Sequence, residues 1–309
     1  MASILRQRKV LHGFLNNHRC FSTNSILNAI NKQQLTTLRK KTGYSFTKCN
    51  EAMKLYENDM EKAEIWLHQQ AEKEGWAKAK KLQSRSTSEG LVGVLTEQNY
   101  IALVEVACET DFVARNELFT ELVGSTAQSV LKFRQKVIEQ NMKVSSNQEI
   151  THLREMVLEH DLKEMKHPSL DVTLEEHLVQ LVGKIGENMK IKRALAMTTN
   201  QENIIGVSTH GGNNTVTSNG SLLGKFAGVV VLKPKTTDVD VENLKKIARD
   251  LSQHVIGMNP IALQPSNDVS KEESLLGQEF LLNDKVTVAE LLNQNQADVV
   301  DFIRYGLTS

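Results

Sequence analysis

A pattern of two strands followed by a helix occurs twice along the chain. In the first copy, a short turn joins 93–96 to the apolar run Tyr100–Val106, and apolar residues then recur at helical spacing from Asn116 onward. In the second copy, a long loop joins 206–209 to the apolar run 226–232. The helix that follows carries apolar residues at helical spacing: Val241, Leu244, Ile247, Ala248 and Leu251. The pattern predicts an α+β fold with two related subdomains, each a small antiparallel sheet with helices on one side.

A compact helical module is predicted ahead of the first strand. A first helix carries Leu35 and Leu38 and ends near 42–43, and Thr47 is expected to open a second helix. Asn58 followed by Glu61 has the spacing of a capping box, which predicts a third helix. The Ser-rich stretch 83–90 then has the composition of a flexible junction.

Between the two copies, the pattern predicts an amphipathic helix over 148–163 and a second helix opened by Thr173 and Glu176. Alternating residues over 189–197 predict a strand. Near the end, Thr287 with Glu290 predicts a capped helix, and 299–303 is expected to form an edge strand.

The start of the chain has the composition of an organelle transit peptide. Residues 1–50 contain nine Lys or Arg and no Asp or Glu, and basic residues interrupt the apolar stretch that a secretory signal needs. Arg19 lies at the spacing of a mitochondrial processing site, so we expect cleavage after Phe21 and import into the mitochondrial matrix. The competing interpretation is a basic arm for nucleic acid or anionic lipid.

Composition further restricts the function. Removal of 1–21 takes away four basic residues and leaves 33 basic against 37 acidic side chains, which argues against a general nucleic-acid binder. Apolar runs such as 227–232 are far shorter than the roughly 20 residues of a membrane-spanning helix. Cys20, Cys49 and Cys108 lack the spacing of a zinc site, and we expect the last two to be buried.

The segment 110–115 places a carboxylate beside an aromatic ring where a strand connects to a helix. Connections often carry function, so an exposed Phe112 next to Asp111 could contact another protein. The alternative is a Phe112 that turns into the core while Asp111 caps the turn. Glu105 and Asp111 are interpreted as solvated charges, since nothing fixes them as an acid and base pair. His210 begins a glycine-bearing loop that could approach a partner closely or form a long hairpin connection.

Four ordered motifs resemble the family of translation elongation factor Ts in its mitochondrial form. The segments 38–43 and 49–52 are similar to the family's ubiquitin-associated-like helical module, and 110–115 (TDFVAR) is similar to its hallmark motif. The segment 184–188 (KIGEN) and the blocks at 277–280 and 302–304 are similar to its other signatures. The resemblance divides the chain into a transit peptide (1–21), a helical module (30–83), and two core subdomains (88–200 and 201–309).

The resemblance implies guanine-nucleotide exchange on mitochondrial elongation factor Tu, with no reaction catalysed, no cofactor, no metal, and neither direct nucleic-acid nor membrane binding. Phe112 would enter an apolar slot of the GTPase, Asp111 would disturb the Mg²⁺ region, and His210 would act on the phosphate-loop side. The residues expected at the partner-binding site come from the motifs 110–115 and 184–188, from the start of the glycine-bearing loop and from 254–260. They are Thr110, Asp111, Phe112, Val113, Ala114, Arg115, Ile185, Gly186, His210, His254, Val255 and Pro260.

The sequence departs from the bacterial members of the family at several places, and two other functions stay open as alternatives. Asn50 and Glu51 stand where bacterial members usually carry Lys, and 267–276 is too short for the bacterial coiled-coil insertion. The loop after His210 is also longer than is typical. A ubiquitin-like-binding adaptor and a mitochondrial ribosome-associated RNA chaperone are the alternatives.

Overall fold

The computed structural model describes residues 32–42, 44–144, 152–212 and 215–308. The expected transit peptide therefore lies outside the described residues. The described residues divide into two compact units, and the division between residues 67 and 68 falls within one helix. The expected boundaries near 83–88 and at 200 stay a prediction.

The first unit contains short helices around a small apolar core. It consists of α1 (Lys32–Thr42), α2 (Phe46–Leu55) and the first part of α3 (Met60–Leu82). Leu38, Met53 and Leu67 are buried in it. Two caps differ from expectation: the Ser45 hydroxyl, not Thr47, caps α2, and the Asp59 carboxylate accepts from the Lys62 backbone N–H at 3.1 Å. Asn58 instead has a positive φ of 68°.

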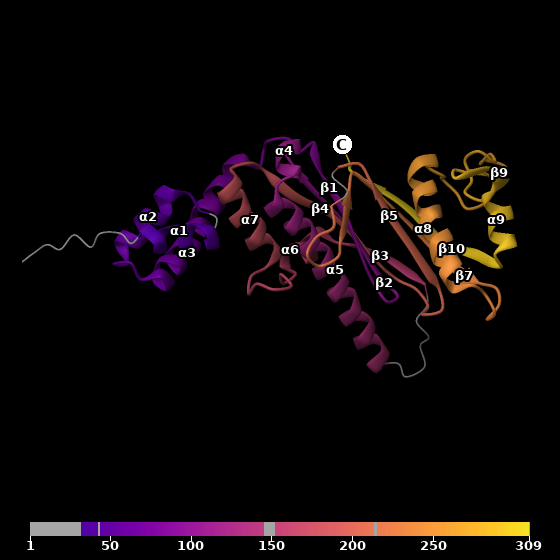
Figure 1. Cartoon of the computed structure of the whole chain (residues 1–309), viewed down its shortest axis with the longest axis horizontal. Coiled ribbons are helices and arrows are strands. Elements are labelled where there is room, and N and C mark those ends of the chain that lie inside the picture. The colour runs from indigo at the N-terminus through magenta and orange to yellow at the C-terminus, as the bar shows by residue number, and fades with distance from the viewer. Residues whose placement is uncertain (1–31, 43, 145–151, 213–214, 309) are drawn as a thin grey trace, which may run out of the picture. The chain divides into compact units, whose positions relative to one another are not determined.

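In the second unit, the described residues form a five-stranded sheet with the order β3-β4-β2-β1-β6 and a three-stranded sheet with the order β10-β7-β5 (Figure 1). Neighbouring strands are antiparallel in both. The first sheet contains β1 (Glu89–Glu97), β2 (Tyr100–Cys108), β3 (Leu153–Val157), β4 (Met189–Thr198) and β6 (Leu222–Gly224). The second contains β5 (Ile204–His210), β7 (Phe226–Pro234) and β10 (Ala297–Gly306). This confirms the expected α+β class and the edge strand.

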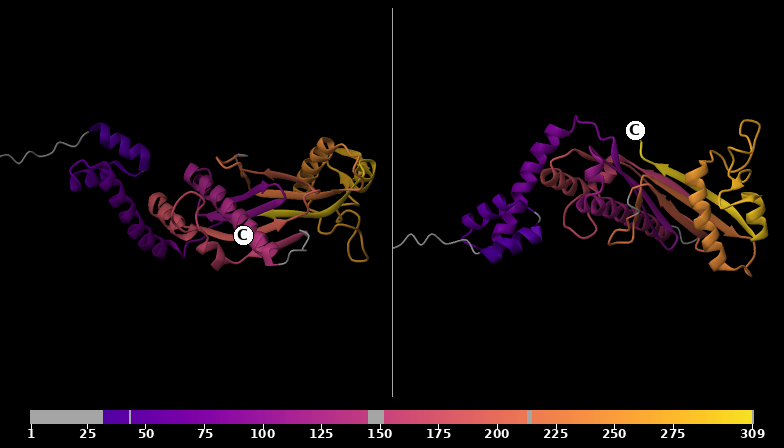
Figure 2. Two further views of the ribbon diagram at one scale, coloured as in Figure 1. Left: turned by 90° about the horizontal axis from the view of Figure 1, so that it is seen from below. Right: turned by 45° about the horizontal axis from the view of Figure 1, so that its top comes forward.

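The helices of the second unit cover the outer faces of the sheets. They are α4 (Asp111–Ala114), α5 (Glu117–Val144), α6 (Glu159–Glu164), α7 (Leu174–Ile185), α8 (Val241–Met258) and α9 (Val288–Gln294), and a small hairpin pairs β8 (Glu279–Phe280) with β9 (Asn283–Thr287). α5 packs on β1 and β2, whereas α8 packs on β5 and β7. Figure 2 shows α5 and α8 on opposite outer sides of the paired sheets.

Strand periodicity explains why the sheets pack face to face. In β2, Ile101 and Leu103 face the second sheet, while Ala102 and Val104 belong to the core under α5. β7 alternates in the same way, with Val229 toward the first sheet. Because successive side chains point to opposite faces, a continuous apolar run has both faces buried. Gly206 and Gly228 leave room for α8, since a Cβ there would lie 2.0 Å and 2.1 Å from its backbone.

One expected helix is wrong. The segment 148–163 contains β3 and the short helix α6 instead, with 145–151 outside the described residues. β3 pairs antiparallel with β4, and this long-range pairing outweighs the local helical pattern. The capping boxes expected at Thr173 with Glu176 and at Thr287 with Glu290 are both confirmed.

A buried carboxylate connects the two sheets. Glu105 is fully buried, so its interpretation as a solvated charge is wrong. Arg193 Nε donates to Glu105 Oε2 at 2.6 Å, and the Thr308 backbone N–H donates to Glu105 Oε1 at 2.8 Å. Arg193 also donates to the Gly306 carbonyl at 2.7 Å. The first sheet thus holds the end of β10 through polar contacts that a buried charge requires.

We expect Glu105→Ala to lower the free energy of unfolding by about 2 kcal/mol, because it leaves the partly buried Arg193 without its carboxylate and the Thr308 backbone N–H without its acceptor. Urea unfolding of the purified chain measures this. Asp171→Ala is the matched control, since Asp171 pairs with Lys166 on the surface, and it should change stability by less than about 0.5 kcal/mol. Equal effects of the two substitutions would contradict the expectation.

Candidate functional site

The candidate site begins where β2 ends. Thr110 has extended backbone angles (φ −125°, ψ 155°) and caps the single turn of α4. Its hydroxyl oxygen accepts from the Val113 backbone N–H at 3.4 Å, and its carbonyl accepts from Ala114 N–H at 3.2 Å. Threonine is a favoured cap because its side chain satisfies a free helix N–H. The segment 110–115 is therefore an ordered turn on the connection between β2 and α5.

In this turn between β2 and α5, two apolar residues are buried and the ring of Phe112 is exposed. Val113 and Ala114 are each only 5% exposed and belong to the core under α5. Phe112 is 80% exposed, so the alternative in which its ring enters the core is wrong. A single exposed apolar side chain is ordinary on a protein surface. A ring held outward by two buried neighbours is, however, well placed to enter a pocket on another molecule.

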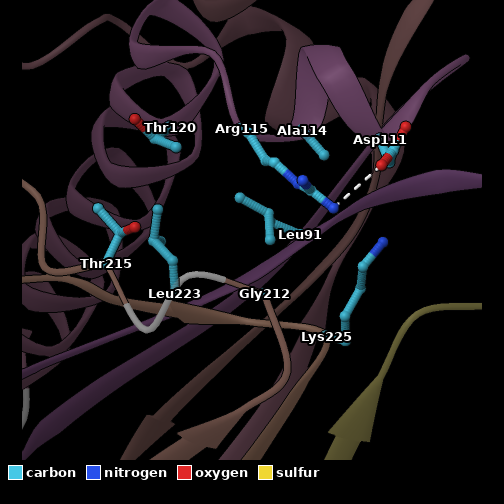
Figure 3. A pocket seen from close by; sticks show the side chains of 9 residues that line it. All are labelled: Leu91, Asp111, Ala114, Arg115, Thr120, Gly212, Thr215, Leu223 and Lys225. Atoms are coloured by element: carbon cyan, nitrogen blue, oxygen red, sulfur yellow. Dashed lines mark ion pairs between the residues drawn. The ribbon is translucent and has the colours of Figure 1, made fainter.

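Asp111 and Arg115 pair beside a small cavity. Their side chains are about half exposed and lie 3.0 Å apart. Figure 3 shows Arg115 reaching across the cavity to Asp111, with Lys225 extending toward them from the opposite side. The cavity has a volume of about 190 Å³, and its other lining residues are Leu91, Ala114, Thr120, Gly212, Thr215 and Leu223. The Asp111 carboxylate is therefore held by a neighbouring cation at the surface.

The motif 184–188 lies next to the turn 110–115 and is hydrogen-bonded to it. α7 ends at Ile185 and is capped by Gly186, whose φ of 84° is readily adopted by glycine. The Thr110 hydroxyl donates to the Glu187 carboxylate at 3.0 Å, and the Asn188 backbone N–H donates to Glu109 Oε1 at 2.6 Å. Ile185 packs partly against the core, and Gly186 is exposed. Sequence reasoning missed Glu187 and Glu109 because the two motifs are about 80 residues apart, and only the pairing of β2 with β4 brings them together.

His210 lies at the exposed end of β5, where the glycine-bearing loop begins. Its carbonyl accepts from the Lys225 backbone N–H at 2.9 Å, so it is adjacent to a residue that lines the Asp111 cavity. It also borders a second cavity of about 530 Å³, together with Phe226, Ile256 and Arg304. The structure thus places His210 beside Lys225 and at the second cavity.

His254, Val255 and Pro260 are buried within the chain, which corrects the expected direct contact of these three residues. His254 and Val255 are 0% exposed. The Leu281 backbone N–H donates to His254 Nδ1 at 3.1 Å, and Nε2 lies 2.9 Å from Gln278 Oε1. The His254 ring therefore bonds to residues at and before the small hairpin of β8 and β9. Large apolar side chains on the surface nearby, which sequence reasoning missed, are Met258, Ile261, Leu281 and Leu282.

Comparison with known proteins identifies the family. The family model "Elongation factor Ts, mitochondrial, N-terminal" matches 18–77, and the model "Elongation factor TS" matches 109–272. Mitochondrial elongation factor Ts of Nematostella vectensis is 42% identical over 89% of this chain and 98% of its own length. The proteins of the same name from Xenopus laevis and Homo sapiens are 39% and 36% identical, over 92% and 90% of this chain and 89% and 83% of their own. The chain belongs to the elongation factor Ts family.

Membership in the elongation factor Ts family gives the activity in outline. The chain is a nucleotide exchange factor for elongation factor Tu in translation elongation, not an enzyme, and it is mitochondrial as its named relatives are. In the described ranges, no helix is long and apolar enough to cross a membrane. Within the same ranges, no group of three or more His, Cys, Asp or Glu is arranged to hold a metal ion.

Burial makes the stability of the His254 region depend on pH. Desolvation lowers the pKa of His254 below its ordinary value of 6.5, and the neutral ring accepts from Leu281 N–H, which a protonated Nδ1 cannot do. The unfolded chain therefore binds this proton more readily. The stability from His254 is complete above about pH 6.5 and is lost as pH falls through the lower folded-state value.

We expect urea unfolding at about pH 7.5 and about pH 5.5 to show this loss, and His254→Gln to reduce the pH dependence. His160→Gln, at an exposed position of α6, serves as the control and should leave the pH dependence as it is. A His254→Gln protein with the full pH dependence would refute the assignment.

Proposed function

We propose that the chain releases GDP from mitochondrial elongation factor Tu by inserting Phe112 into an apolar site of the GTPase, while Asp111 disturbs the surroundings of its Mg²⁺ ion. The observation that carries this mechanism is the 80% exposure of Phe112 on a turn whose next two residues, Val113 and Ala114, are buried. Membership in the elongation factor Ts family supplies the partner.

The energy available from the ring is sufficient for the proposed role. Full burial of a Phe side chain contributes about 1.5–3 kcal/mol. Since about 1.4 kcal/mol changes an equilibrium tenfold, insertion can favour the nucleotide-free state by roughly 10- to 100-fold. By linkage, a partner that binds the nucleotide-free GTPase more tightly must weaken GDP by the same factor. Mg²⁺ requires near-ideal octahedral geometry, so a small displacement of its ligands loosens the nucleotide.

Because the turn is already ordered, less of the free energy gained by burying the ring is lost to immobilising the turn on binding. Immobilising a flexible side chain or loop on binding costs free energy, and a preorganised segment avoids part of that cost. Val113 and Ala114, which follow the ring in the chain, anchor the backbone of the turn in the core. Phe112 therefore meets the GTPase with its backbone already fixed.

Other surfaces contribute affinity in this proposal. His210 contacts the phosphate-loop side of the GTPase, and Gly186 lies close enough to the turn to approach the same domain. A second domain of the partner binds the exposed apolar residues near the end of α8, with Met258 and Ile261 taking the role first expected of the buried His254, Val255 and Pro260. The acidic balance of the mature chain supports a protein partner rather than direct nucleic-acid binding.

We expect Phe112→Ala to lower the catalytic efficiency of stimulated GDP release by about 10- to 100-fold, because it deletes the inserted ring. The assay follows fluorescent GDP leaving elongation factor Tu at increasing concentrations of the variant. The melting temperature should not fall, since the removed ring is exposed.

Phe133→Ala is the matched control for this experiment. Phe133 is another partly exposed ring, 38% accessible, but it lies on α5 away from the turn. The control should exchange nucleotide as the unmodified chain does. Full stimulated release by Phe112→Ala would exclude the insertion mechanism.

The matrix location is also part of the proposal, supported by the basic start of the chain and the names of the relatives. We expect the full chain, added to isolated energised mitochondria, to become protease-protected and to be cleaved after Phe21. N-terminal sequencing of the imported product checks the position. Retention outside the inner membrane would contradict the matrix assignment.

A further inference from the structure

We infer that Glu187 is a positioning residue for exchange, which acts by fixing the orientation of the Thr110 cap and hence of Phe112. This inference rests on the proposed function. It explains how the second motif contributes to exchange, because Glu187 and Asn188 hold the turn from behind. We refer to Glu187, Asn188, Glu109 and Arg85 as the turn brace.

The first half of the turn brace acts on the cap hydroxyl. Thr110 Oγ1 lies 3.0 Å and 3.2 Å from the two carboxylate oxygens of Glu187, to which it donates. With its proton directed at Glu187, the hydroxyl presents a lone pair to the Val113 N–H. A hydroxyl that donates and accepts at once is held in one rotamer, and each bond strengthens the other.

The second half fixes the residue before the cap. Asn188 is 4% exposed, and its backbone N–H donates to Glu109 Oε1 at 2.6 Å. Its side-chain amide donates to the Arg85 carbonyl at 2.9 Å, and Arg85 pairs with Glu109 at 3.3 Å. Consecutive residues of the 187–188 segment thus contact consecutive residues of the 109–110 segment. Such paired contacts fix both position and rotation.

The turn needs external support because α4 is very short. A helix of four residues has too few internal hydrogen bonds to be stable alone. The turn brace itself is anchored on longer elements, because α7 begins with a capping box and is capped at its end by Gly186, and β4 starts immediately after Asn188. The brace therefore transmits the rigidity of α7 and β4 to the one turn that carries the exposed ring.

This arrangement predicts a specific kinetic effect. Contacts elsewhere on the chain give affinity for the GTPase, whereas the ring must reach one position to displace the nucleotide, and small misplacements of an acting group reduce rates steeply. Loss of the Glu187 carboxylate should then lower the maximal rate of GDP release and change the half-saturating concentration little. A residue that only supplied affinity would do the opposite.

The test compares Glu187→Ala with Glu187→Gln in the full mature chain. Glu187→Ala should reduce the maximal stimulated rate of GDP release about fivefold, with less than about a twofold change in the half-saturating concentration. Glu187→Gln keeps a carbonyl oxygen that can accept from Thr110 and should stay within about twofold of the unmodified rate. Glu175→Ala, in the first turn of α7 at its far end from the brace, is the matched control and should be unchanged.

A double substitution separates positioning from direct contact. If Glu187 acts through the ring, Glu187→Ala should cost less than about twofold when Phe112 is already Ala. The same fivefold loss in both backgrounds would show that Glu187 acts independently of Phe112 and would overturn the inference. An unmodified rate in the single variant would overturn it as well.

Amide hydrogen exchange of the free protein gives a readout that does not depend on the partner. Exchange at Val113 should be several-fold faster in Glu187→Ala than in Glu187→Gln, while the protected amides of β2 are unaffected. If Phe112→Ala alone kept full activity, the proposed function would fail, yet this measurement would still report on the turn brace. If Phe112→Ala lost activity and Val113 exchange stayed unchanged in Glu187→Ala, only the positioning inference would fail.

Discussion

Burial of β2 on both faces is the constraint on which the candidate site depends. One face of the strand packs under α5, and the other packs against the second sheet. Close packing in a core leaves a strand little freedom to shift or rotate. The residues after Cys108 therefore leave the core at a fixed point and in a fixed direction. The orientation of Phe112 is a consequence of packing that extends through the whole second unit.

Hydrogen bonds between polar groups add to the apolar packing in fixing β2 and the turn that follows it. Glu105, on β2, faces Arg193 across the β2–β4 pair and also binds Thr308 beyond β10. A few residues later, Glu109 and Thr110 bind the loop between α7 and β4. β2 thus carries a buried polar contact, at Glu105, that joins the two sheets. The residues just after β2 make a second set of polar contacts, which support the exposed turn. Both use groups from segments distant in sequence.

Local pattern predicted the elements well and their long-range partners poorly. The period-two alternation in 189–197 and the capping boxes at Thr173 and Thr287 depend on neighbouring residues, and these elements formed as expected. The helix expected over 148–163 failed because β3 exists only by pairing with β4. Glu105 looked like a surface charge because its partner Arg193 is 88 residues away.

The site shows the same division. The residue types in 110–115 indicated a protein contact, but sequence alone left open whether Phe112 pointed inward or outward, because both directions fit a strand-to-helix connection. The burial of His254 likewise depends on Gln278 and Leu281, which local spacing does not place beside it. Resemblance to a family located the functional segments, and the packing of the described residues distinguished exposed side chains from those that support them.

The contact between Glu105 and Thr308 bears on how the chain reaches its native state. In the proposed import, the chain enters the matrix from its N-terminus, so β1, β2 and α5 are available before β10. During that interval the Glu105 carboxylate lacks its contacts with the final residues, and the apolar face of β2 lacks Ile303 and Tyr305. The first sheet can form early, but its inner face is only partly covered, by β5 and β7, until the last strand arrives. Completion of the core, and with it the firm placement of the exchange site, is accordingly a late event in the maturation of this protein.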